Sequence, residues 1–401
     1  MQQGSIRRGL AALAITAFAL ASTSAYAIDT ITVGFLDDMS GAAAESGNDG
    51  LHAVQLAVDE INEKGGIAGR KIDLKVYDGK TDPQLSATFA TRFAEDDMGL
   101  VLIGGNPAVP TGAVIPVINE YELPYFTLSA ATDSFTEPST PYHFRVGPKN
   151  SQDAAAIAEV IARQGFKTAA VVNNSLPYGI DGGDAVTAAL EAAGVKVVSH
   201  EVYDVNATDL SPQIATVRDS DAEVLVIWPY PADGARVLRT LSQLNVTIPR
   251  VVARIALYDT LRQLAAEAGD GALVTNTVDP ERPEVAAFFE RFNARFGQRP
   301  PTMYIAMGYD AAKIAFEAID TPEVNAALEA DDVAAARTAI RDAVERIGEF
   351  DGLNGLAGVR YSFGPGEHHG PPDAGWFVWL EVADSGKSLI KADMDKFKPA
   401  R

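Results

Sequence analysis

The stretch from residue 31 to residue 83 constrains the fold more than any other part of the chain. It begins with the run ITVGFL, whose β-branched and aromatic residues are typical of a buried strand. Apolar residues then recur at helical spacing between Leu51 and Ile61, and apolar and polar residues alternate as in a strand from Ile72 to Tyr77. Strand, helix and strand in this order predict a βαβ unit with a right-handed crossover onto a parallel sheet.

Local signals mark where the helices of this unit end and begin. Gly65 and Gly66 follow the first helical pattern, and glycine is favoured at a helix C-terminus because it adopts a left-handed conformation without strain. Asp82 precedes Pro83, which predicts the start of the next helix, with a capping carboxylate and a proline at the first position.

Strand and helix patterns continue to alternate in two blocks. The first block runs to Val146, and the pattern restarts at Asn150. Helical patterns dominate residues 283–349, and two strand-like runs follow at 358–363 and 376–382. Such alternation is typical of doubly wound α/β sheets, so the chain is predicted to form two similar lobes with parallel-sheet cores.

Three segments carry a specific resemblance to a known family: DDMSG (37–41), AVDEINEKGGIAGRKIDLKVYDGKTDP (57–83) and LSAAT (128–132). They resemble the type I periplasmic solute-binding proteins, in the leucine/isoleucine/valine-binding branch that serves ABC transporters. The resemblance covers nearly the whole chain after residue 27. It implies two Rossmann-like lobes joined by a three-crossing hinge, with crossings near residues 147, 275 and 352. The expected lobes are 28–147 with 275–351, and 148–274 with 352–401.

Residues 1–27 are predicted to be a cleaved signal peptide. Arg7 and Arg8 precede an apolar stretch, which ends before the small-residue cleavage site Ala25-Tyr26-Ala27. An N-terminal membrane anchor is the alternative. The chain has no cysteine, which excludes a lipid-modified N-terminal cysteine and disulfides. We therefore expect a periplasmic protein with no direct membrane anchor.

Charge and motifs exclude several other classes. The formal net charge of −21 argues against binding to nucleic acid or to anionic lipid. Neither a phosphate-binding glycine motif nor a nucleophile motif is present, so we expect no enzyme activity and no cofactor. His368 and His369 are adjacent in a glycine- and proline-rich loop, where they are expected to be exposed rather than to bind a metal.

Parallel α/β sheets bind ligands beyond the carboxyl ends of their strands, and this rule locates a candidate site. In the first lobe it selects Asp37-Asp38 and the loops at 106–109 and 129–132, and in the second lobe 175–178, 228–230 and Arg254. These loops precede predicted helices, where free N–H groups favour an anionic group.

The resemblance assigns roles to particular residues in these loops. It implies that a ligand carboxylate is held by the backbone of Ala130 and the hydroxyl of Thr132. A serine turn of the family aligns with Pro107-Ala108, where only the N–H of Ala108 could serve. Tyr178 and Tyr230 match two tyrosines of the family's pocket.

Two other positions are expected to shape the pocket. Asp38 belongs to a turn that resembles the turn of relatives that take aromatic or other organic acids. Ser46 stands where amino-acid binders have an aromatic residue that covers the ligand, which implies more room there.

Arg254 departs from the family pattern. It aligns with a glutamate that accepts the ligand's ammonium group in amino-acid binders, and a buried cation there would repel an amine at a cost of several kcal/mol. Our hypothesis is that Arg254 forms a bidentate pair with an acid group of a ligand that has no amine. Alternatively, Arg254 turns outward or pairs with Asp37, Asp38 or Asp259.

The sequence thus predicts the solute-binding component of an ABC importer, with permease subunits in the inner membrane as partners. The expected ligand is a small organic acid, either aromatic or of another kind, captured as the lobes close. A branched-chain or other amino acid is the alternative ligand, and a ligand-sensing domain for a signalling partner is the alternative function.

Overall fold

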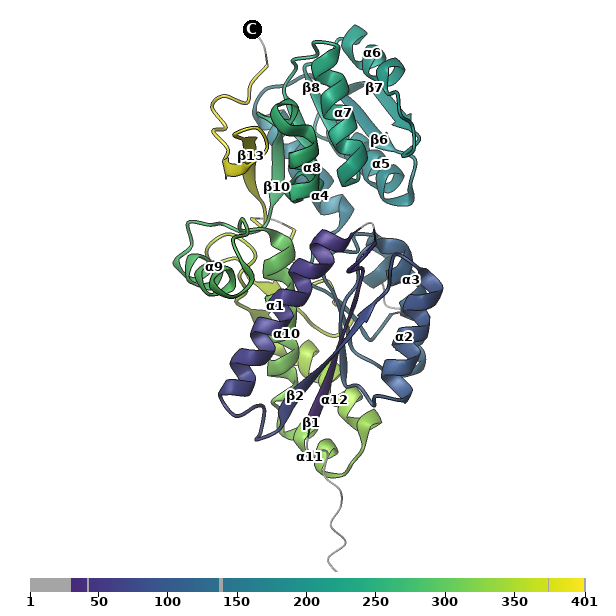
Figure 1. Ribbon diagram of the computed structural model, residues 1–401, viewed down its shortest axis with the longest axis vertical. Coiled ribbons are helices and arrows are strands. Elements are labelled where there is room, and N and C mark those ends of the chain that lie inside the picture. Colours follow the sequence, from purple (N-terminus) through teal and green to yellow (C-terminus); the bar gives the residue numbers. More distant parts are fainter. Residues whose placement is uncertain (1–29, 42, 137–139, 374, 400–401) are drawn as a thin grey trace, which may run out of the picture.

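The computed structural model describes residues 30–41, 43–136, 140–373 and 375–399, which form two lobes (Figure 1). The predicted signal peptide lies outside these residues. In the part of the chain that is described, no helix is both long and apolar enough to cross a membrane.

The first lobe is built on a five-stranded sheet with the order β2-β1-β3-β4-β5, in which all pairs are parallel. The strands are β1 (Thr30–Asp37), β2 (Lys71–Asp78), β3 (Val101–Gly104), β4 (Tyr125–Thr127) and β5 (His143–Arg145). Helix α1 (Ala44–Glu63) connects β1 to β2, so the predicted βαβ unit is confirmed. The predicted cap is also confirmed, because the Asp82 carboxylate accepts from the N–H groups of Gln84 and Leu85 at the start of α2 (Pro83–Glu95).

Alternate residues of these strands point to opposite helical layers. Phe35, Ile103 and Phe126 join the core beneath α1 and α10 (Met303–Ile319), whereas Leu36 and Leu102 join the core beneath α2 and α3 (Ala108–Glu120). The helices that complete this lobe are α2 (Pro83–Glu95), α3 (Ala108–Glu120), α10 (Met303–Ile319), α11 (Pro322–Glu329) and α12 (Val333–Ile347).

The second lobe is built on a seven-stranded sheet with the order β14-β13-β10-β9-β8-β6-β7. The strands are β6 (Thr168–Asn174), β7 (Lys196–Tyr203), β8 (Val224–Trp228), β9 (Arg250–Val252), β10 (Leu273–Asn276), β13 (Val378–Ala383) and β14 (Ser388–Lys391). Its helices are α4 (Asn150–Arg163), α5 (Pro177–Ala192), α6 (Ser211–Asp219), α7 (Pro231–Gln243) and α8 (Asp259–Ala265). The core is parallel as expected, but β13 and β14 add an antiparallel edge.

The connections between the lobes run through the middle of the molecule. After β10 the chain forms α9 (Pro283–Phe296) and returns to the first lobe at α10 (Figure 1). Strands β11 (Glu349–Phe350) and β12 (Tyr361–Ser362) pair with each other. Arg145 of β5 donates from its N–H to the carbonyl of His368 at 2.8 Å. The crossing of the chain between the lobes that we expected near residue 352 stays a proposal. Because this hydrogen bond joins residue 368 to a strand of the first lobe, it favours a crossing after residue 370.

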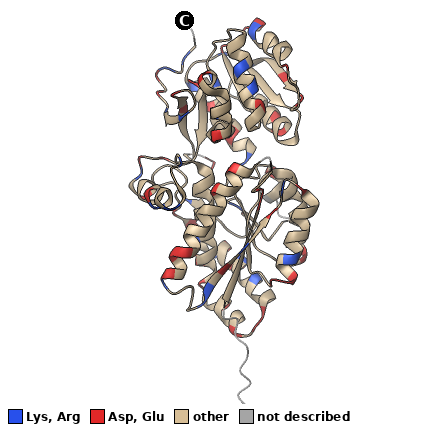
Figure 2. Ribbon diagram, viewed as in Figure 1, with Lys and Arg blue, Asp and Glu red and all other residues tan. Residues whose placement is uncertain are grey.

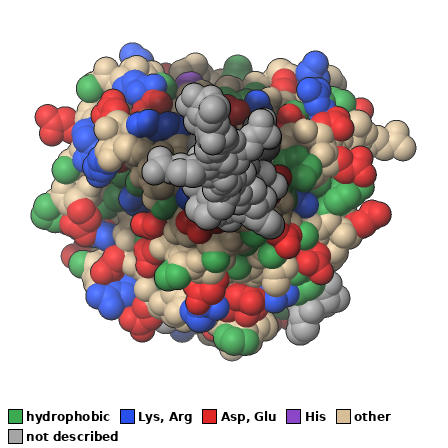
Figure 3. Space-filling model, turned by 90° about the horizontal axis from the view of Figure 1, so that it is seen from below, with side chains coloured by type: hydrophobic (Ala, Val, Ile, Leu, Met, Phe, Trp, Pro, Cys, Tyr) green, Lys and Arg blue, Asp and Glu red, His purple; other side chains and the backbone are tan. Residues whose placement is uncertain are grey.

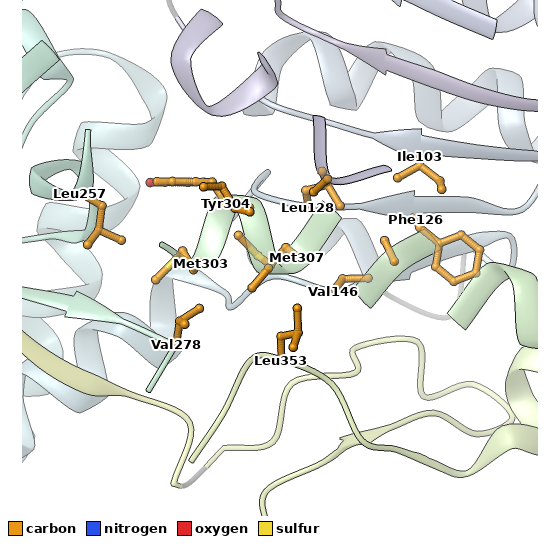
Figure 4. Close-up of a cluster of buried hydrophobic side chains, with 14 of the residues drawn as sticks. Ile103, Phe126, Leu128, Val146, Leu257, Val278, Met303, Tyr304, Met307 and Leu353 are labelled. Carbon is orange, nitrogen blue, oxygen red and sulfur yellow. The ribbon is translucent and has the colours of Figure 1, made fainter. Parts of the chain in front are cut away.

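The hydrophobic core is continuous across the hinge. Met303, Tyr304 and Met307, from the first turns of α10, lie between strand residues of the first lobe and Leu257 of the second (Figure 4). Gly308, in the same helix, packs against the backbone of Gly50 in α1, where an added Cβ would come within 2.6 Å of the Gly50 carbonyl oxygen.

Acidic residues are distributed over both lobes (Figure 2). On the face shown in Figure 3 they alternate with Lys, Arg and apolar side chains rather than forming one acidic field. This distribution fits a solvated surface, in agreement with the excess of acidic over basic residues in the sequence.

Candidate functional site

A cavity lies between the lobes, at the carboxyl ends of parallel strands from both sheets. The first lobe contributes the loops after β3 and β4, and the second lobe contributes the loops after β8 and β9. The cavity is narrow in this arrangement of the lobes, because its lining leaves only about 20 Å³ for a water-sized sphere. Its lining comprises Ala43, Asn106, Pro107, Ala108, Ser129, Ala131, Tyr178, Tyr230, Pro231, Arg254, Ile255, Tyr258 and Tyr304.

A wider and mainly apolar groove, with a volume of about 560 Å³, leads from this inner cavity to solvent. Pro107, Tyr230, Pro231 and Tyr258 line both spaces, so they form the boundary between them. We call the two spaces the inner cavity and the mouth.

Four of the residues expected at the site line the inner cavity: Ala108, Tyr178, Tyr230 and Arg254. Ala108 is the first residue of α3, where backbone N–H groups have no partner within the helix and can bind an anionic group. Tyr178 and Tyr230 stand side by side with ring centroids 5.4 Å apart. The hydroxyl of Tyr178 is buried and has no hydrogen-bond partner, which leaves it free for a polar group of a ligand.

Arg254 is almost fully buried, and its terminal nitrogens are already engaged. It forms an ion pair with the buried carboxylate of Asp153, and Nη1 donates to the carbonyl of Pro148 at 3.2 Å. Burial is the largest single influence and lowers the pKa of the Arg254 guanidinium, but the charge and hydrogen bond of Asp153, together with Tyr178 and Tyr304, outweigh burial and raise that pKa. The partner is none of the three carboxylates that we considered from the sequence.

The expected pair between Arg254 and a ligand acid therefore stays a prediction, with a new constraint. Only Nε of the guanidinium is buried without a hydrogen-bond partner, so a bidentate pair would require the contacts to Asp153 or Pro148 to break. Because Asp153 balances the charge, Arg254 repels an amine less than an unpaired cation would.

Hydrogen bonds to the protein fix the backbone of the turn that follows β4. Ala130 donates from its N–H to the carbonyl of Gly105 at 2.9 Å. The Arg145 guanidinium donates to the carbonyls of Ala130 and Thr132. Ser129 and Ala131, the neighbours of the two expected residues, line the inner cavity, and the ligand contacts proposed for Ala130 and Thr132 stay untested.

Asp38 and Ser46 lie outside the lining of the inner cavity. The Asp38 carboxylate accepts from the N–H groups of Gly41 and Ala43 and from the hydroxyl of Thr81, so it organises the loop that enters α1. The Ser46 hydroxyl accepts from Tyr258 at 2.7 Å. The room expected at Ser46 is thus filled by a tyrosine from the other lobe.

Several residues at the site were not anticipated from the sequence: Asn106 as an individual contact, Asp153, Tyr258 and Tyr304. Tyr258 and Tyr304 pack edge to face with ring centroids 4.9 Å apart. Asp153 sits in the first turn of α4, where an acidic residue has an ordinary electrostatic role, so its local pattern gave no signal.

Among the described residues that line the inner cavity, none is a His, Cys, Asp or Glu that could bind a metal ion. Within the described ranges, no group of three or more His, Cys, Asp and Glu side chains is arranged to hold a metal ion. His368, expected to be exposed, is instead buried, and its Nε2 lies 2.8 Å from a carboxylate oxygen of Glu345.

Comparisons with known proteins agree with this geometry. Residues 30–381 match the family described as periplasmic binding protein. The Leu/Ile/Val-binding protein BraC3 of Rhizobium johnstonii is 26% identical, over 79% of this chain and 84% of that protein. An amino acid binding protein of Pseudomonas aeruginosa is 26% identical, over 77% of this chain and 83% of that protein.

Solved structures show the same fold. A type 1 periplasmic binding protein from Bordetella pertussis has a TM-score of 0.78 at 26% identity, covering 91% of this chain and all of that one. The branched-chain amino acid substrate-binding protein LivJ from Streptococcus pneumoniae, solved with isoleucine, has a TM-score of 0.76 at 18% identity, covering 90% and 99%. The chain therefore belongs to the periplasmic binding proteins, a family of solute-binding proteins rather than enzymes.

Proposed function

We propose that the chain is the extracytoplasmic solute-binding component of an ABC importer and that it takes an amino acid into the inner cavity. The observation that carries the proposal is that the inner cavity and the adjoining mouth both have walls from the two lobes. A solute there contacts both halves at once and so favours the closed arrangement. The names of the relatives, which bind leucine, isoleucine and valine, support an amino acid over the organic acid that we expected first.

The cavity offers suitable groups for such a solute. The N–H groups at the start of α3 suit a carboxylate. The tyrosine rings and Ile255 give an apolar wall for a side chain, and the free hydroxyl of Tyr178 can accept from an ammonium group.

One observation favours a second candidate, a carboxylate without an amine. Among the described residues that line the inner cavity, none is Asp or Glu, so an ammonium group would have no direct anionic partner there. Arg254 lines the cavity and could supply Nε to an acid group.

A thermal-shift screen separates the two candidates. The purified protein is unfolded and refolded to remove retained solute and then tested with leucine, isoleucine and valine, with their deaminated analogues, and with benzoate. A solute present at 100 times its Kd adds about 2.7 kcal/mol to the free energy of unfolding. Shifts with the amino acids alone support the proposal, shifts with the deaminated acids alone support the second candidate, and no shift with either set contradicts both.

The same proposal covers location and partners. The family and the importer class favour the periplasm, with inner-membrane permease subunits as partners. Uptake of the identified solute by vesicles that contain the permease should require this protein. A signal from a kinase partner without any uptake would instead support the sensing alternative.

A further inference from the structure

A charged network at the mouth connects the two lobes directly. The Glu45 carboxylate, in the first turn of α1, accepts from the N–H groups of Asp259 and Thr260 at 2.5 and 3.0 Å and from the Thr260 hydroxyl at 2.8 Å. Glu45 belongs to the first lobe, whereas α8 begins at Asp259 in the second. Glu45 therefore supplies acceptors, from across the cleft, to the free N–H groups of another lobe's helix.

Arg299 strengthens this connection. It lies between α9 and α10 and pairs with Asp49 of α1 at 2.7 Å and with Glu45 at 3.3 Å, both in the first lobe. Its other terminal nitrogen lies 2.8 Å from Asp259 of the second lobe. About 24% of the Arg299 side chain is exposed, so solvent screens these pairs only in part.

The network is adjacent to the boundary of the cavity. Tyr258, one residue before α8, separates the inner cavity from the mouth, and its hydroxyl donates to Ser46 across the lobes. Asp259 is also paired with Arg262, whose buried guanidinium donates to the carbonyls of Ala256 and Leu257. Through Arg262, the position of Asp259 is therefore coupled to the position of the backbone segment that carries Tyr258.

We propose that Glu45 and Arg299 are positioning residues for solute capture: they latch the start of α8 to α1 and so hold Tyr258 across the inner cavity. This inference rests on the proposed function for its biological meaning, but the latch itself needs no solute. The closed arrangement should therefore be populated even in solute-free protein, and the latch should slow the escape of a bound solute.

The absence of cysteine allows a direct test by spin labelling. Val76 of β2 and Val202 of β7 are exposed and lie on the edge strands of the two sheets, so Val76→Cys and Val202→Cys place one label on each lobe. Pulsed electron paramagnetic resonance then reports the distance between the lobes in the refolded, solute-free protein.

We expect Arg299→Gln and Glu45→Gln to raise the ratio of open to closed protein about fivefold, and Arg299→Lys to restore part of the closed population. The control is Arg291→Gln, which removes an ion pair between α9 and Glu60 of α1 that does not cross the cleft. Circular dichroism verifies that each variant is folded.

The dependence of the distance between the lobes on salt provides a second measurement. This distance would not respond to salt if Glu45 and Arg299 had a merely structural role. Raising NaCl from about 0.1 M to 1 M shortens the Debye length from about 10 to 3 Å, so it should open the unsubstituted protein but leave Arg299→Gln unchanged. Identical distances between the two spin labels in the unsubstituted protein, Arg299→Gln and Glu45→Gln would overturn the proposal of a latch. A failed solute screen with these shifts intact would overturn the proposed function instead.

Discussion

At the scale of single residues, the pair of Arg254 and Asp153 is the most consequential feature near the cavity. Both side chains are buried, and Arg254 also donates to the hinge carbonyl of Pro148. A buried charge that loses its partner costs far more than an exposed one, because nothing else compensates for its desolvation. The pair therefore has a structural role whether or not Arg254 contacts a solute.

We predict that Asp153→Asn lowers the free energy of unfolding by about 3–5 kcal/mol, because it leaves Arg254 charged and uncompensated. Urea denaturation followed by circular dichroism measures the change. The matched control is Glu159→Gln on the same helix, which removes an exposed ion pair with Arg163 and should cost less than about 0.5 kcal/mol. An equal loss of unfolding free energy in the two variants would show that the buried charge of Arg254 does not need Asp153 as a partner.

Asp49, also a single residue, gives a prediction of pH dependence. Burial raises the pKa of the Asp49 carboxyl to about 6, aided by Glu45 and Asp259 and opposed by Arg299. Its pKa in the unfolded chain is the ordinary 3.8, so between pH 4 and 6 the folded state binds more protons than the unfolded one. This carboxyl thus contributes most to stability at low pH, and the contribution is lost as the pH rises through about 6.

The test compares the protein with Asp49→Asn in urea from pH 4 to pH 7.5. The free energy of unfolding of the unsubstituted protein, minus that of the variant, should fall by about 2–3 kcal/mol from pH 4 to pH 7. His52, whose pKa is lowered by burial and by Arg299, stays in both proteins and cancels in the difference. A difference that is constant with pH would contradict the raised pKa of Asp49.

At the scale of helices and strands, local sequence predicted most of the structure. The βαβ unit and the Asp82 cap followed from periodicity and capping chemistry, which act over a few residues. The antiparallel pairing of β13 and β14 could not be predicted in this way, because an alternation of period two does not specify whether strands pair parallel or antiparallel. Asp153 and Tyr258 were missed for a related reason: their partners lie more than a hundred residues away in the chain.

The packing of α10 on α1 depends on glycine. A Cβ at Gly308 would come within 2.6 Å of the carbonyl oxygen of Gly50, and backbone cannot yield as a flexible side chain can. We predict that Gly308→Ala destabilises the fold by about 1–3 kcal/mol, despite alanine's higher helix propensity. Gly364→Ala is the control, since nothing lies within 4 Å of its added Cβ. Thermal unfolding measures both, and a stabilised Gly308→Ala would mean that the helices separate without cost.

At the scale of the whole molecule, one of the hydrophobic clusters includes residues of both lobes. Tyr304 and Met307 of α10 contact that core between the sheets, and Leu257 of the second lobe belongs to the same cluster (Figure 4). The closure that we propose must therefore preserve this apolar contact. Continuity of the core also implies that damage to one lobe is transmitted to the other.

Phe126→Ala tests this continuity. Phe126 is buried in β4 of the first lobe, so its truncation should cost about 3–5 kcal/mol. The three tryptophans, in contrast, lie in β8, in β13 and just before β13, so their fluorescence reports the second lobe and its tail. We expect the urea midpoint from tryptophan fluorescence to fall together with the midpoint from circular dichroism, whereas Met98→Ala, at an exposed site, changes neither. If only circular dichroism shifts, the lobes unfold independently and the shared core does not couple them.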